Sequence, residues 1–172
     1  MASDSIFKKK HILLSLMFIA YTIPIYLVYS FYQSKQHKDS ISSIVSGHPL
    51  ILFMMLVMGF FTVLYEKTRN DYTSLVYILM LLIGIYGILL IKETYTIHYF
   101  FATLVFVSII GFMYHHCSQT TCKMLNLFFI IQVVTFFLLG SCLYLNSPYF
   151  FHLEVLLLAN FTLYYLYLHI FS

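Results

Sequence analysis

Histidine and carboxylate side chains stand near the starts of three apolar stretches of the sequence. His48, His98 and Glu154 lie in or beside the first turns of these stretches, and Glu93 and His152 stand close by. Imidazole nitrogens bind metals and haem iron, and imidazole and carboxylate groups relay protons. These five residues are therefore the first candidates for a binding site.

A second group of ligand-type side chains lies in one short segment. It contains His115, His116 and Cys117, followed by Cys122. Imidazole and thiolate suit both zinc and copper, so the segment predicts a small metal site. The alternative is a polar connection between helices that binds nothing.

The other polar groups inside or beside apolar stretches indicate packing and turns. Gln132 and Asn160 stand near the middle of two stretches, where amide side chains hydrogen-bond to neighbouring helices. Residues 66–71 carry balanced charges and predict a solvated turn. The sequence contains no pattern typical of a nucleophile with its base or of a phosphate-binding glycine loop, which favours a protein that is not an enzyme.

The composition excludes an ordinary soluble domain. Of the 172 residues, 62% are apolar and 9% are charged, and the mean hydropathy is +0.91. So few charged side chains could not cover a globule of this size, and the apolar surface requires lipid as its solvent. The net charge of +3 is spread thinly, with one dense run at residues 8–10. This pattern excludes nucleic-acid binding, which needs a basic face over a whole domain.

Six uncharged runs are long enough to form helices that cross a bilayer. A crossing helix needs about 20 apolar residues, and a β-barrel would instead show shorter segments of alternating polarity. The sequence therefore predicts an all-α fold, a single domain over residues 1–172 built as a bundle of six transmembrane helices. The spans are residues 12–32, 49–65, 73–91, 96–114, 124–145 and 149–171.

The distribution of basic residues predicts that both termini lie in the cytoplasm. With that orientation six basic residues face the cytoplasm and three face the other side, as the positive-inside rule requires. The longest connection, residues 33–48, is polar and is expected to be a mobile loop. The cytoplasmic set is Lys8, Lys9, Lys10, Lys67, Arg69 and Lys123, and the opposite set is Lys35, Lys38 and Lys92.

This topology places the first candidate residues at one depth. The second, fourth and sixth spans run in the same direction, so His48, His98 and Glu154 begin helices at one level. We expect these three side chains to share a pocket near the non-cytoplasmic surface. His152 should point away, because two residues along a helix correspond to a rotation of about 160° from Glu154. The alternative is that the histidines are interfacial anchors.

Part of the sequence resembles the di-haem b-type transmembrane cytochromes. The resemblance covers about 65 residues, from His48-Pro49-Leu50 through Gly84-Ile85-Tyr86-Gly87 to Ile97-His98-Tyr99. It implies a six-helix fold in which His48 and His98 ligate one haem b. The family's second histidine pair belongs on the third and fifth spans, where this chain has no histidine. The resemblance therefore implies at most one haem.

The segment His98-Tyr99-Phe100-Phe101-Ala102 also resembles the six-helix FRAG/DRAM/SFK-type membrane proteins. That resemblance implies a regulatory or lipid-trafficking protein without an established catalytic centre. The sequence as a whole thus favours a non-enzymatic membrane interaction or regulatory protein. A single-haem redox protein and a small-solute transporter are the two alternatives. The expected partners are the lipid bilayer and either another membrane protein or a second copy of the chain. No pattern in the sequence indicates the organelle.

Overall fold

The computed structural model describes residues 2–35, 40–46, 48–91, 94–145 and 147–171. These residues form helices joined by short connections, which confirms the prediction of an all-α fold. The helices are α1 (Ala2–Lys35), α2 (Ile41–Ser46), α3 (Pro49–Arg69), α4 (Tyr72–Leu90), α5 (Thr96–Gln119), α6 (Lys123–Tyr144) and α7 (Phe150–Phe171).

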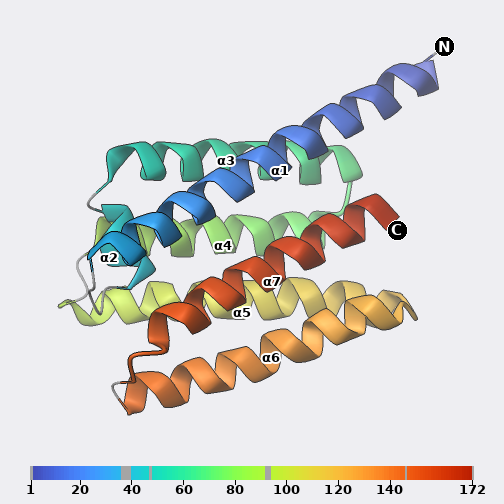
Figure 1. Cartoon of the computed structure of the whole chain (residues 1–172). Coiled ribbons are helices and arrows are strands. Elements are labelled where there is room, and N and C mark those ends of the chain that lie inside the picture. The colour runs from blue at the N-terminus through green and yellow to red at the C-terminus, as the bar shows by residue number, and fades with distance from the viewer. Residues whose placement is uncertain (1, 36–39, 47, 92–93, 146, 172) are drawn as a thin grey trace.

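The six long helices form a closed ring. Each packs against the next in the order α1, α3, α4, α5, α6, α7, and α7 returns to α1. Successive long helices run in opposite directions, so α3, α5 and α7 all begin at the same end of the bundle (Figure 1). We call this the α2 end, because the short helix α2 lies there. The opposite end, where α1 begins and α7 ends, is the termini end.

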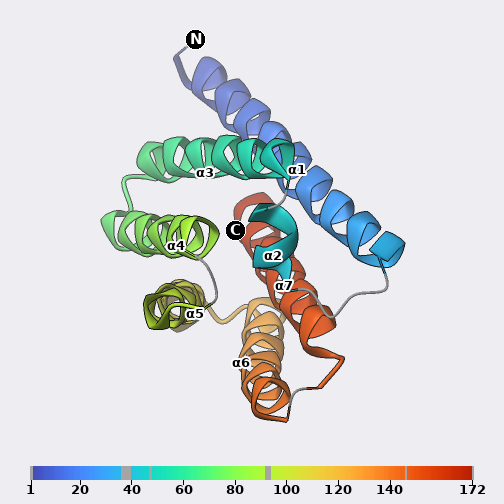
Figure 2. The same ribbon diagram turned by 90° about the vertical axis from the view of Figure 1, so that its left-hand side faces the viewer.

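Helix α2 replaces the mobile loop expected at residues 33–48. Figure 2 shows α2 inside the ring when the bundle is viewed from its α2 end. It contacts α1, α3, α4 and α7. Val45 is 0% exposed and Ile44 is 8% exposed, so the short helix buries its apolar residues in the mouth of the ring. The expectation of a mobile loop is therefore wrong for residues 41–46.

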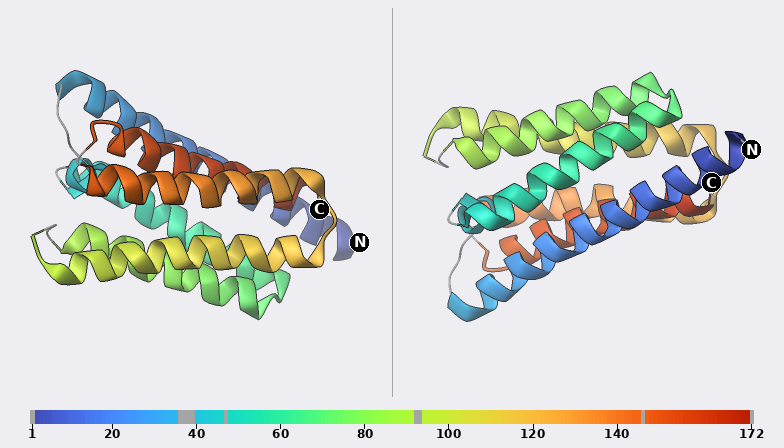
Figure 3. Two further views of the ribbon diagram at one scale, coloured as in Figure 1. Left: turned by 90° about the horizontal axis from the view of Figure 1, so that it is seen from below. Right: turned by 90° about the horizontal axis from the view of Figure 1, so that it is seen from above.

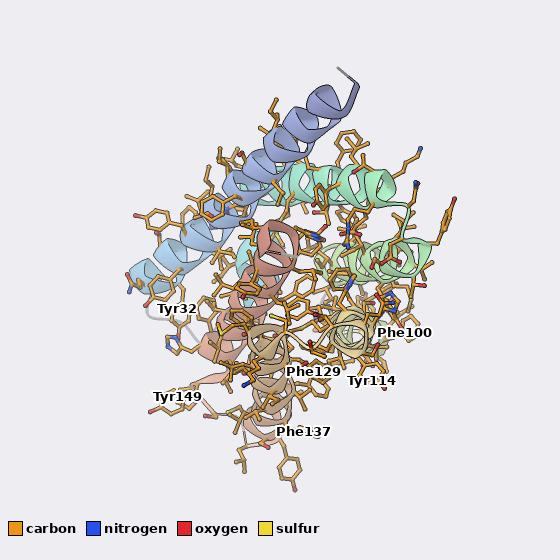
Figure 4. The ribbon with its side chains drawn as sticks, turned by 90° about the vertical axis from the view of Figure 1, so that its right-hand side faces the viewer. Tyr32, Phe100, Tyr114, Phe129, Phe137 and Tyr149 are labelled. Atoms are coloured by element: carbon orange, nitrogen blue, oxygen red, sulfur yellow. The ribbon has the colours of Figure 1, made fainter. Side chains whose placement is uncertain are left out.

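Five helices, α3 to α7, are long and apolar enough to cross a membrane. Their outer surfaces carry large apolar side chains, and Figure 4 shows Phe100, Tyr114 and Phe137 directed away from the bundle. These three side chains are more than 60% exposed. An apolar exterior of this kind is stable only against lipid.

Local signals in the sequence set the helix ends. Pro49 is the first residue of α3, where its missing N–H costs nothing. Asn70 ends α3 with a φ of 58°, a left-handed conformation that asparagine tolerates. The next residue, Asp71, caps α4 by accepting a hydrogen bond of 3.1 Å from the backbone N–H of Ser74. The turn between α3 and α4 is consequently short and well ordered.

Side chains fill the interior of the ring toward the termini end. Tyr65 from α3, Ile109 and Phe112 from α5, and Tyr164 and Tyr165 from α7 are at most 1% exposed. They belong to one continuous cluster of buried apolar residues that joins all six long helices. The interior of the ring is therefore packed at this end.

Helices α6 and α7 are joined by a buried amide pair. Asn160 Nδ2 donates a hydrogen bond of 2.6 Å to Gln132 Oε1 and another of 2.9 Å to the carbonyl of Phe128. Gln132 is 1% exposed and Asn160 is 5% exposed. The prediction that these two residues form hydrogen bonds between helices is confirmed.

Helices α4 and α5 approach each other closely at two glycines. A Cβ atom at Gly84 would lie 3.0 Å from the backbone N of Val105 and 3.1 Å from the carbonyl oxygen of Phe101. A Cβ atom at Gly87 would instead meet the side-chain ring of Phe101. Small residues allow such backbone approach between membrane helices. At Gly84 the distance between α4 and α5 is therefore set by backbone atoms, which cannot move aside as a flexible side chain can.

We expect Gly84→Ala to destabilise the protein by about 1–3 kcal/mol, because the new methyl group must push α5 away from α4. Denaturant-induced unfolding of the purified protein in detergent micelles measures this effect. Gly140→Ala is the matched control, since a Cβ at Gly140 meets nothing within 4 Å. The control should leave stability unchanged or raise it, because alanine favours helix. Equal loss of stability in both variants would contradict the close-approach explanation.

Candidate functional site

A pocket of about 120 Å³ lies inside the ring near the α2 end. We call it the His98 pocket. Its polar lining consists of two side chains, His98 and Glu154, and the remaining lining is apolar. The apolar lining residues are Ile41, Met55, Ile85, Ile88, Leu89, Ala102, Val105, Phe106, Leu157 and Leu158.

A second apolar pocket of about 70 Å³ adjoins the first and extends toward the termini end. The two pockets share the lining residues Ile41, Met55, Ile85 and Leu158. Thr62 and Thr162 supply the polar side chains of the second pocket, and Thr162 donates its hydroxyl hydrogen to the carbonyl of its own helix at Leu158. The two pockets are therefore neighbours with a mostly apolar lining, and His98 and Glu154 belong to the first of them.

His98 is held by a hydrogen bond at the start of α5. Its Nδ1 lies 2.8 Å from the backbone carbonyl oxygen of Ile91, just after the end of α4. Because a carbonyl only accepts, Nδ1 carries the hydrogen. The side chain is 6% exposed, and Nε2 has no hydrogen-bond partner among the described residues. The ring is thus oriented by one nitrogen, and His98 lines the pocket.

Glu154 connects the pocket to α2. Its Oε2 accepts a hydrogen bond of 2.9 Å from the backbone N–H of Ile41, the first residue of α2. The first N–H groups of a helix lack partners within the helix, and a carboxylate there satisfies one of them and complements the helix dipole. Glu154 therefore helps to seat α2 in the mouth of the ring.

The structure brings together two of the three residues predicted to share a pocket. His98 and Glu154 line the His98 pocket, whereas His48 is not among its lining residues. The ring of His48 stacks on Phe31 of α1 with centroids 4.0 Å apart and planes 15° apart. His152 is exposed and meets Tyr32 edge-on. The side chain of Glu93, also predicted to belong to this polar layer, lies outside the described residues.

A second polar site is buried at the termini end. Glu66 of α3 is 0% exposed, although the sequence predicted a solvated turn at residues 66–71. Tyr165 donates a hydrogen bond to Glu66 Oε1, and His169 Nε2 lies 3.2 Å from the same oxygen. Arg69 Nη1 lies 3.5 Å from Oε2. The prediction of a solvated turn is wrong for Glu66, because α3 continues beyond the predicted span and carries this carboxylate into the interior.

Asp71, Ser74 and His116 form a second polar contact beside Glu66. Ser74 Oγ lies 2.7 Å from His116 Nε2 and donates a hydrogen bond of 2.7 Å to Asp71 Oδ2. Ser74 Oγ has one hydrogen, so His116 Nε2 donates to the serine. Burial raises the pKa of Asp71, but the hydrogen bonds from Ser74 outweigh it and hold that pKa below its usual value. Asp71 is therefore ionised and links α4 to α5 through Ser74.

The four residues of the predicted metal site have separate partners. His116 bonds to Ser74, while Cys117 Sγ lies 3.6 Å from the hydroxyl of Tyr164. Hydrogen bonds from the backbone N–H groups at the start of α6 lower the pKa of the Cys122 thiol. Within the described residues, no group of three or more His, Cys, Asp or Glu side chains is arranged to hold a metal ion. A metal site at His115, His116, Cys117 and Cys122 gains no support from this arrangement.

Sequence reasoning missed the partners of Glu66 altogether. Tyr165 and His169 stand four residues apart on α7, so they share one face of that helix. This spacing was the available signal, because two polar side chains on one face of an apolar helix indicate an interior contact. The sequence did not show that the partner was a carboxylate one hundred residues earlier.

Comparisons with protein-family models, curated proteins and solved structures found nothing that matches this chain. The class of the protein therefore rests on its own features. Its five long apolar helices, apolar exterior and internal pocket fit a multi-pass integral membrane protein.

We expect Tyr165→Phe to destabilise the protein by about 1.5–3 kcal/mol, because it removes a hydrogen bond to a buried charged group. Denaturant-induced unfolding in detergent micelles measures the change. Tyr114→Phe is the matched control, since Tyr114 is 63% exposed on the bundle exterior. Similar stability of the two variants would show that the hydroxyl of Tyr165 contributes nothing to holding Glu66.

Proposed function

We propose that the protein is a six-span integral membrane protein that binds an apolar molecule inside its helix ring. It belongs to the membrane interaction and regulatory proteins, not to the enzymes. The observation that carries this proposal is the pair of adjoining pockets, whose lining is apolar apart from two threonines, His98 and Glu154.

The chemistry of the lining favours a hydrocarbon as the occupant. A water molecule in a cavity needs two to four polar partners, and apolar cavities of similar size stay dry and take up apolar molecules. Binding sites between the helices of a bundle follow the same pattern of an apolar lining with a few polar groups. A lipid chain from the surrounding bilayer meets these requirements without any further protein partner.

The six-span topology includes α1 as the first span and places the termini end in the cytoplasm. Lys67 and Arg69 at the end of α3 and Lys123 at the start of α6 lie at the termini end (Figure 3). Residues 8–10 of α1, three lysines, belong to the same end. Basic residues concentrate on the cytoplasmic side of membrane proteins, which supports this orientation.

Single cysteines introduced at Lys8 and Arg69, in a background without the native cysteines, should react with a membrane-impermeant thiol reagent only from the cytoplasmic side. A cysteine at Lys38 should react only from the opposite side. Sealed vesicles of both orientations provide the measurement, and permeabilised vesicles provide the control for reactivity. Labelling of the Lys38 and Arg69 positions from the same side would contradict the six-span topology.

Ala102→Phe should block the His98 pocket, because the new ring fills space that Ala102 leaves open. The measurement is photolabelling of the purified protein with a 14-carbon hydrocarbon that carries a diazirine, followed by identification of the labelled peptides. In the wild-type protein we expect label on peptides that line the pockets, in addition to the exterior. The variant should lose most of the label on the lining peptides and keep the label on the exterior.

Thr103→Phe is the matched control, since Thr103 is the exposed neighbour of Ala102 on α5. It adds the same ring to the lipid-facing surface and should leave labelling of the pockets unchanged. Label restricted to the exterior of the wild-type protein would contradict the proposed function.

Haem binding is a second candidate function, and the orientation of His98 favours it. A histidine that ligates a metal commonly donates its other ring N–H to a backbone carbonyl, as His98 does toward Ile91. The pocket supplies this one histidine, because His48 stacks on Phe31 and does not line it. A Soret absorption band in the purified wild-type protein, absent from His98→Phe, would support this candidate in place of the apolar ligand.

A further inference from the structure

The polar groups of the His98 pocket select the head group of its ligand. We propose that the pocket binds a long-chain molecule with a terminal hydroxyl group, and that this hydroxyl donates a hydrogen bond to Nε2 of His98. The inference rests on the proposed function, which states only that an apolar molecule enters the pocket.

The hydrogen bond to Ile91 determines what His98 can offer a ligand. Because Nδ1 donates to the Ile91 carbonyl at 2.8 Å, Nε2 is the ring nitrogen that can accept a hydrogen bond from a ligand. His98 is 94% buried, and Nε2 has no hydrogen-bond partner in the described part of the chain. A ligand that donates a hydrogen bond would give this nitrogen a partner.

Glu154 strengthens the same selection. It is the other polar side chain of the pocket lining, and its Oε2 already accepts from the N–H of Ile41. An ionised carboxylate accepts hydrogen bonds and donates none. A carboxyl side chain in the lining therefore favours a head group that donates a hydrogen bond.

The apolar remainder of the site accounts for the long chain. Beyond the two polar side chains, the lining of the His98 pocket is apolar, and it shares Met55, Ile85 and Leu158 with the adjoining pocket. A hydroxyl at His98 would leave the attached hydrocarbon directed into this apolar volume. A long-chain alcohol combines one donor with one chain and matches both parts of the site.

The test compares two probes whose oxygen carries either a hydrogen, which can be donated, or a methyl group. 1-Tetradecanol and its methyl ether, 1-methoxytetradecane, compete with the diazirine hydrocarbon for the lining peptides of the wild-type protein. We expect the alcohol to compete at a concentration about tenfold lower than the ether, the difference that one hydrogen bond of typical strength produces. In His98→Phe the two probes should compete equally.

Tyr99→Phe is the matched control, because Tyr99 is the exposed neighbour of His98 and keeps its ring in the variant. It should retain the preference for the alcohol. Should His98→Phe fail to fold, the comparison of the two probes on the wild-type protein decides by itself. Tetradecanoate provides a third probe for a carboxylate head group.

The outcomes separate this inference from the proposed function. Equal competition by alcohol and ether, or stronger competition by tetradecanoate, overturns the hydroxyl assignment while the apolar ligand stands. If a folded His98→Phe variant still prefers the alcohol, the hydroxyl assignment is also overturned. Absence of any label on the lining peptides overturns the proposed function itself.

Discussion

Closing six helices into a ring is the constraint on which the rest of this structure depends. A ring leaves a central space, and in lipid no hydrophobic force draws helices together to close it. At the termini end, aromatic side chains such as Tyr65, Phe112 and Tyr165 fill the space. At the α2 end, a short helix enters the mouth of the ring. The pockets lie in the part of the ring between the aromatic side chains and the short helix, because neither of these fills it.

A carboxyl side chain stabilises each closure in a different way. At the termini end Glu66 receives a hydrogen bond from Tyr165 and lies near both His169 and Arg69, so its charge is compensated across the ring from α3 to α7. At the α2 end Glu154 accepts the first N–H of α2. Carboxylates within membrane domains are expensive and are retained where they pair with specific groups. Here Glu66 connects α3 to α7 and Glu154 connects α7 to α2, which fixes positions that apolar packing alone does not specify.

The histidines illustrate how position in the fold determines chemistry. His48 and His98 stand at the starts of the parallel helices α3 and α5, yet His48 stacks on Phe31 and His98 lines the pocket. His116 contacts Ser74, and His169 contacts Glu66. Of these four residues, His98 is the one that lines the pocket, and it carries the proposed ligand specificity.

The sequence by itself determined that the chain forms long apolar helices, where most of them begin, and that Gln132 and Asn160 bond between helices. Hydropathy and proline positions suffice for this, because a helix in lipid must satisfy its own backbone and needs a minimum length. Only the tertiary structure decided the burial of Glu66, the helix at residues 41–46 and the separate partners of His116 and Cys117. The physical reason is that these helices are apolar on every side. In a soluble protein an apolar stripe shows which face is buried, whereas here the rotation of each helix is set by contacts such as those at Gly84 and Tyr165.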